Sequence, residues 1–256
     1  MKRLALLAAL GLSAQAAQAS AQALRFIACP VYRDADSGKK SGCWLADDPA
    51  SGRRFDVSQA PSKPDWNHEV LVEGRVSAAP GDPCGGVVLD PVRTSILPGA
   101  CVRHMLPAEG YKGLPFVLPK RNVAPMSAVR AVPPGPYAPT TFHLFYDFDQ
   151  AFLIYQYDDY LLDQAITWIR AAKPRAIVVT GYAATEPAII SGRRLAENAT
   201  IARTRADRVA EALVRLGVDR RIITVRAVGK AAPVDVDTAD GLAEPSRRRT
   251  DILVRP

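Results

Sequence analysis

The sequence has few of the residues on which metal sites and enzymes depend. Its 256 residues include three histidines and four cysteines, and no two cysteines form a C-x-x-C pair. Clustered histidines and paired cysteines are the usual zinc ligands, so we expect no metal. The chain also lacks a G-x-S-x-G elbow, a P-loop, a dinucleotide-binding glycine fingerprint and an H-E-x-x-H helix. These absences predict a protein that is not an enzyme and has no cofactor.

Concentrated positive charge and long apolar runs are absent as well. The net charge is +7, and two of these charges belong to Lys2 and Arg3. The remaining excess is divided almost evenly between the two halves of the chain, whereas phosphate binding needs a concentrated basic surface. We therefore expect no nucleic-acid partner. Apolar runs are shorter than the roughly 20 residues that cross a bilayer, so we expect no membrane span.

Residues 1–23 predict a secretory signal peptide. Lys2 and Arg3 precede an apolar run from Leu4 to about Leu12, and a tail of Ala, Gln and Ser follows with two small-x-small cleavage sites. A short membrane anchor is the alternative, but the apolar run is too short for one. The sequence therefore predicts export.

The four cysteines all lie within the first half of the chain. An even number of cysteines in an exported chain favours disulfides over free thiols, and four cysteines allow three pairings. We favour a nested pair because such bridges often close the ends of a small barrel. The predicted bridges are Cys29–Cys101 and Cys43–Cys84.

Three regions follow the signal peptide. In residues 24–118, short strand-like runs alternate with turn signals such as Ser37-Gly38, which predicts a small, barrel-like antiparallel β domain with two disulfides. Residues 119–140 are rich in proline, which favours an extended linker. Residues 141–256 form the third region. The whole chain is thus of the α+β class.

Strand-like and helix-like segments alternate in residues 141–256. Their order predicts a β-α-β-α-β-β sandwich with both helices on one face of a mixed sheet. In the first strand Asp147 and Asp149 are expected to point to the same side. The predicted segments are His143–Phe148, Tyr160–Ala172, Ala176–Gly181, Arg203–Leu216, Ile222–Val228 and Thr250–Val254.

Several motifs in this region occur in a recognisable order. The motif N-x-x-I-A-x-x-R-A, at the predicted second helix, begins at Asn198, and the motif R-R-T-D-I begins at Arg248. Together with Phe145–Asp149 and Gly181-Tyr182, these motifs resemble the OmpA C-terminal-like family over residues 142–256. The resemblance implies a periplasmic protein of the Gram-negative envelope, next to the outer membrane. It also implies non-covalent binding of peptidoglycan through the diaminopimelate of its stem peptide.

The resemblance also implies which residues bind the ligand. Diaminopimelate carries carboxylates and an ammonium, so its site needs a guanidinium and a carboxylate. The matching positions are Arg205, Asn198, Arg248 and Asp147. On this assignment, Arg205→Ala should weaken binding and leave the melting temperature nearly unchanged.

One departure from the family lies at the expected carboxylate. Where the family has G-H-T-D, this chain has Gly181-Tyr182-Ala183-Ala184, so the acid opposite Arg205 is missing. Glu186 or Glu197, in a longer loop, would restore the negative charge. The alternative is that the fold has lost wall binding and acts as a protein–protein interaction module. Another envelope protein could then bind through the N-terminal domain.

Overall fold

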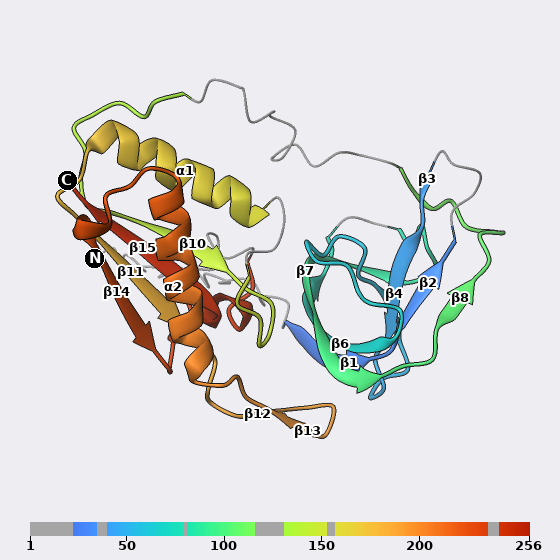
Figure 1. The fold of residues 1–256 in the computed structure, drawn as a ribbon. Coiled ribbons are helices and arrows are strands. Elements are labelled where there is room, and N and C mark those ends of the chain that lie inside the picture. Colours follow the sequence, from blue (N-terminus) through green and yellow to red (C-terminus); the bar gives the residue numbers. More distant parts are fainter. Residues whose placement is uncertain (1–22, 35–39, 79–80, 116–130, 153–156, 235–240) are drawn as a thin grey trace, which may run out of the picture.

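The computed structural model describes residues 23–34, 40–78, 81–115, 131–152, 157–234 and 241–256 (Figure 1). Residues 1–22 of the predicted signal peptide and residues 119–130 of the predicted linker lie outside this part of the chain. We call residues 24–115 the β domain and residues 140–256 the C-terminal domain. No helix in the described part of the chain is both long and apolar enough to cross a membrane.

The β domain is built on a seven-stranded sheet that curls into a barrel-like shape (Figure 1). Its strand order is β1-β6-β7-β5-β4-β2-β8, and a separate two-stranded ladder joins β3 to β9. The strands are β1 (Leu24–Ala28), β2 (Pro30–Arg33), β3 (Lys40–Ser41), β4 (Cys43–Asp47), β5 (Arg54–Asp56), β6 (His68–Val76), β7 (Val87–Ala100), β8 (His104–Leu106) and β9 (Leu114–Pro115).

Strand β6 is buried on both faces. Successive side chains of a strand point to opposite sides, so Val70 and Val72 enter the core of the β domain. Leu71 and Glu73 face the other way and are also buried. Leu71 packs in a cluster with Ile190 of the C-terminal domain. The outer face of β6 is therefore an interface between the two domains.

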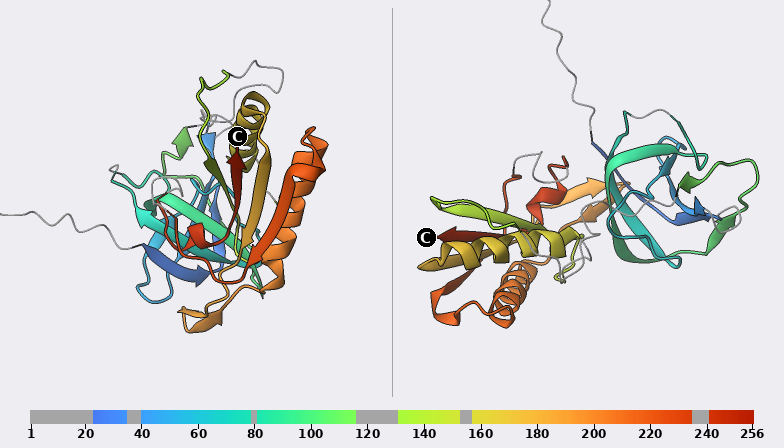
Figure 2. Two further views of the ribbon diagram at one scale, coloured as in Figure 1. Left: turned by 90° about the vertical axis from the view of Figure 1, so that its left-hand side faces the viewer. Right: turned by 90° about the horizontal axis from the view of Figure 1, so that it is seen from above.

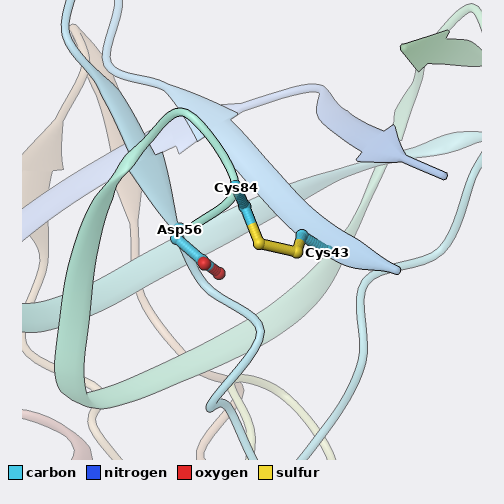
Figure 3. Close-up of side chains that lie close together, drawn as sticks. All are labelled: Cys43, Asp56 and Cys84. Atoms are coloured by element: carbon cyan, nitrogen blue, oxygen red, sulfur yellow. A yellow bond between two sulfur atoms is a disulfide. The ribbon is translucent and has the colours of Figure 1, made fainter. Parts of the chain in front are cut away.

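Two disulfides close the β domain. The structure has the nested pairing, with Cys29 bonded to Cys101 and Cys43 bonded to Cys84. The second bridge joins the start of β4 to the loop after β6, and the carboxylate of Asp56 lies beside it (Figure 3). Cys43, Asp56 and Cys84 lie close enough together to suggest a metal site. Because the two sulfur atoms are bonded to each other, they are not available as thiolate ligands.

The C-terminal domain is a four-stranded sheet with both helices on one face (Figures 1 and 2). The strand order is β10-β15-β11-β14, in which only the β11–β14 pair is parallel. The elements are β10 (Thr140–Phe145), α1 (Tyr157–Ala172), β11 (Ala176–Tyr182), β12 (Ala188–Ile190), β13 (Arg193–Leu195), α2 (Thr200–Arg215), β14 (Ile223–Val228) and β15 (Arg249–Arg255), with 3-10 turns at Arg220–Ile222 and Pro245–Arg247.

The core of this domain lies between the helices and the sheet. Ile166 of α1 and Val209 and Leu213 of α2 pack on Val179 and Ile252 of the sheet. Gly181 lets α2 approach β11 closely, since a Cβ atom there would lie 1.9 Å from the carbonyl oxygen of Ala202. This packing confirms the predicted α+β sandwich.

One expectation about the end of the first strand is wrong. Strand β10 ends at Phe145, so Asp147 and Asp149 do not share one side of a strand. The chain turns instead at Asp149, whose φ of 54° is left-handed. The longer loop after β11 contains the hairpin β12–β13.

Candidate ligand-binding site

Arg205 lies at the centre of the loops at one end of the C-terminal sheet. Helix α2 places this side chain in the interior, where it is 0% exposed. Its Nε donates to the carbonyl of Gln150 (2.8 Å), and its terminal nitrogens donate to the carbonyls of Tyr182 (2.8 Å) and Asp147 (3.3 Å). The same nitrogens donate to both carboxylate oxygens of Glu197, at 3.0 and 2.6 Å. All five donors of the guanidinium are therefore engaged within the chain.

Glu197 supplies the carboxylate that the sequence lacks at position 184. Besides Arg205, its oxygens accept hydrogen bonds from the backbone N–H of Asp149 (2.8 Å) and of Ala184 (2.6 Å). One buried carboxylate thus joins α2 to the loops that follow β10 and β11. Of the two acids that the sequence suggested, Glu197 contacts Arg205, whereas Glu186 pairs with Lys230 at 2.5 Å on the surface.

Arg248 lies just before β15 and is 1% exposed. Its Nε donates to the carbonyl of Tyr146 (3.3 Å), and its terminal nitrogens bind both carboxylate oxygens of Glu73 in the β domain. The Nε of Arg25 on β1 also donates to Oε1 of Glu73, at 3.0 Å. Glu73 therefore holds two guanidiniums, one from each domain.

The charges around Glu73 determine its protonation. Burial alone would raise the pKa of this carboxyl, but the guanidiniums of Arg248 and Arg25 outweigh burial and hold the pKa below its ordinary value. For Arg248, burial would lower the pKa, and the Glu73 carboxylate reverses that effect and raises it. Both groups are thus charged at neutral pH.

The other two predicted site residues lie near this pair. Asp147 is buried, and its carboxylate lies 3.6 Å from a terminal nitrogen of Arg93 on β7. Burial raises the pKa of Asp147 despite that neighbour. Asn198 is exposed and accepts hydrogen bonds from the backbone and hydroxyl of Thr200 at the start of α2 (3.0 and 2.9 Å). Asn198 therefore stabilises the start of the helix.

A cavity of about 190 Å³ opens between Arg248 and the loop that follows β11. Its charged lining consists of four cationic and two acidic side chains: Arg25, Lys230, Arg247, Arg248, Glu186 and Glu244. Ala183, Ala184, Pro187, Phe148 and Leu195 supply apolar lining. The cavity thus offers charges of both signs with an excess of positive charge.

Sequence reasoning brought Arg205, Arg248, Asp147 and Glu186 to one region but missed three partners. Glu73, Arg25 and Arg93 come from the β domain, and they pair with Arg248, Glu244 and Asp147 at separations of 175, 219 and 54 positions in sequence. No local motif marks them.

Residues 145–248 match the OmpA family. This part of the chain is thus an OmpA-family domain. The matched residues include Arg205 on α2 and Glu197 and Arg248 in loops. A comparison with the curated protein sequences finds no match.

Solved structures with a similar fold come from several bacteria. The OmpA-like domain of FopA1 from Francisella tularensis is 20% identical, with a TM-score of 0.36 over 45% of this chain and 72% of that one. The peptidoglycan-associated lipoprotein from Burkholderia pseudomallei is 24% identical, with a TM-score of 0.34 over 44% and 90%. The cell wall anchor of the T6SS from Pseudomonas aeruginosa is 22% identical, with a TM-score of 0.33 over 43% and 74%.

Proposed function

We propose that this protein is a non-enzymatic component of the Gram-negative periplasm that binds peptidoglycan through its OmpA-family domain. The observation that carries the proposal is the cavity beside Arg248, in the region that matches the family. The two disulfides fit an oxidising compartment such as the periplasm.

The charges of the cavity fit the end of a stem peptide. Diaminopimelate has two carboxyl groups and, when linked into the peptide, a free ammonium. Arg247 and Lys230 offer donors to a carboxylate, and Glu186 and Glu244 offer acceptors to the ammonium. The excess of cationic side chains favours a ligand with more carboxylates than ammonium groups.

The residues that match the family then have different roles. Arg248 forms a wall of the cavity and Glu186 lies at its exposed side. Arg205, Asp147 and Asn198 hold the surrounding loops in place, because the donors of Arg205 are all engaged and Asn198 accepts hydrogen bonds from Thr200 at the start of α2. In this proposal Arg205 supports the site and does not receive the ligand carboxylate directly.

Pull-down of the purified full-length protein on purified sacculi tests the proposal. We expect the protein to sediment with sacculi and to be released by the tripeptide L-Ala-γ-D-Glu-meso-diaminopimelate. A matched tripeptide that ends in lysine lacks the second carboxylate and should compete more weakly. If the protein stays in the supernatant at every concentration of sacculi, the proposal is wrong, and the domain is better explained as an interaction module for another envelope protein.

A further inference from the structure

The β domain contributes a charged side chain to the lining of the cavity. Of the described residues that line it, Arg25 alone belongs to the β domain. Its side chain is 24% exposed and forms part of the cavity lining. Nε is committed to Glu73 at 3.0 Å, and Glu244 lies 3.7 Å from one terminal nitrogen. Donors on the terminal nitrogens thus remain available to a ligand.

Glu73 fixes the position of Arg25. The Glu73 carboxylate is 1% exposed and also binds the buried guanidinium of Arg248, so it is a fixed anchor for Arg25. Two guanidiniums that would otherwise repel each other are thereby held at the same wall of the cavity. Pre-positioned donors lose little conformational entropy when a ligand binds.

The interface around this wall is well packed. Ile27 of β1 clusters with Ile190 of the β12–β13 hairpin, and the backbone N–H of Ile27 donates to the Ser191 hydroxyl (3.0 Å). The backbone N–H of Phe148 donates to the hydroxyl of Ser95 on β7 (2.8 Å). These contacts hold β1, and with it Arg25, against the loops of the C-terminal domain.

We infer that the ligand site is built by both domains, with Arg25 of the β domain binding a ligand carboxylate and Glu73 acting as its positioning residue. This inference rests on the proposed function and assigns the β domain a part in it. The ligand class is a small anionic zwitterion, and the second domain raises selectivity for its extra carboxylate. A site within the OmpA-family domain alone would not depend on β1.

The experiment is calorimetric titration of the full-length protein with the diaminopimelate tripeptide. Arg25→Ala should weaken binding about tenfold or more, which is the effect of losing one hydrogen bond to a charged group. Arg25→Lys should recover part of the loss, because it restores charge without the planar fork. Melting temperatures are measured for the same variants. A merely structural role for Arg25 would weaken binding only where the variant begins to unfold, whereas loss of a ligand contact weakens binding at temperatures where the variant is fully folded.

The matched control is Arg54→Ala. Arg54 is another half-buried arginine of the β domain that pairs with one carboxylate, Asp47, at 2.7 and 2.8 Å, and it does not line the cavity. Its replacement should leave binding unchanged.

The effect of Glu73→Gln on binding separates this inference from the alternative that Glu73 blocks the site. If Glu73 positions Arg25, Glu73→Gln should weaken binding. If Glu73 instead blocks Arg248 as an internal substitute for the ligand, Glu73→Gln should tighten binding, and our inference is wrong. Wild-type binding that Arg25→Ala leaves unchanged also overturns it while the proposed function stands. Absence of wild-type binding overturns both.

Discussion

The carboxylate of Glu73 on β6 lies buried against the guanidinium of Arg248 before β15, across 175 positions of sequence and between two domains. A buried ion pair of this kind is not a strong source of net stability, because removing both charges from water costs nearly what their attraction returns. Breaking it by removing one partner is costly, because the other charge then stays buried alone.

The first prediction concerns this pair. Arg248→Ala should lower the free energy of unfolding by about 3–5 kcal/mol, since Glu73 keeps only Arg25 as a partner. The double variant Glu73→Leu/Arg248→Met should lose less than the two single variants together. Urea unfolding of wild type, Glu73→Leu, Arg248→Met and the double variant measures the coupling. Exposed Arg221, paired with Asp219, is the control, and Arg221→Ala should have no measurable effect. If the changes in the free energy of unfolding from the two single variants simply add in the double variant, Glu73 and Arg248 do not interact.

The second prediction is the pH dependence of the same contact. The pKa of Glu73 is below its ordinary value of 4.5 in the folded protein, so its stabilising contribution is complete above that value and is lost as the pH falls through the folded pKa. The difference in melting temperature between wild type and Glu73→Gln should therefore be largest near neutral pH and shrink in acid. A difference that grows on acidification would mean that Glu73 is not ionised in the fold.

The third prediction has the opposite sign. Burial raises the pKa of Asp56 above 3.8, although the N–H of Ser58 and the charge of Lys63 oppose the shift. Its Oδ2 has no hydrogen-bond partner among the described residues. The folded state thus favours the protonated acid, and Asp56 costs stability as the pH rises above the unfolded value. Asp56→Asn should raise the melting temperature at pH 7 and give no gain near pH 3.

Asp48 is the control for this experiment. Although burial alone would raise its pKa, hydrogen bonds from Ser51 and Ala50 hold the pKa below 3.8. Asp48→Asn should therefore lower stability at neutral pH, if it has an effect. If both variants change the melting temperature at neutral pH in the same direction, burial of the ionised Asp56 carboxylate does not cost stability.

The fourth prediction corrects the expectation for Arg205. Because the guanidinium is fully buried on Glu197, Arg205→Ala should lower the free energy of unfolding by about 3–5 kcal/mol, and the melting temperature should fall clearly. Arg203 lies two positions away on the same helix, exposed and paired with Asp207. Arg203→Ala should change little. Equal melting temperatures for Arg205→Ala and wild type would show that Arg205 does not form the buried ion pair with Glu197.

Local patterns predicted the main elements because each depends on short-range spacing. The apolar positions of α2, such as Val209 and Leu213, recur at helical intervals and face the sheet. The position of Asp147 was predicted wrongly because Tyr146–Asp149 alternates apolar and polar residues like a strand. In the structure the backbone N–H of Tyr146 bonds to the carbonyl of Arg248, and the chain turns at Asp149.

The charged contacts of the site could not be predicted in the same way. Whether Arg248 meets a ligand or Glu73 depends on how two domains pack, and no periodicity encodes that. The local sign of the interface is the apolar run Val70-Leu71-Val72 of β6, which is typical of a strand covered on both faces. Such a run does not identify what covers it.

The last prediction tests whether Glu197 has replaced the family's acid at position 184. Glu197→Gln should destabilise the domain, because Arg205 would keep its carbonyl acceptors but lose its only ion pair among the described residues. The backbone N–H of Ala184 lies 2.6 Å from the Glu197 carboxylate, so an acid at 184 starts close to the same guanidinium.

Ala184→Asp should therefore restore part of the melting temperature in the Glu197→Gln background. In the wild-type background the same substitution should destabilise, because two carboxylates would then compete for one arginine whose donors are already engaged. Thermal unfolding of the wild type, both single variants and the double variant gives the coupling directly. If Ala184→Asp has the same effect in both backgrounds, the two positions do not share Arg205, and Glu197 has not taken over the role of the missing acid.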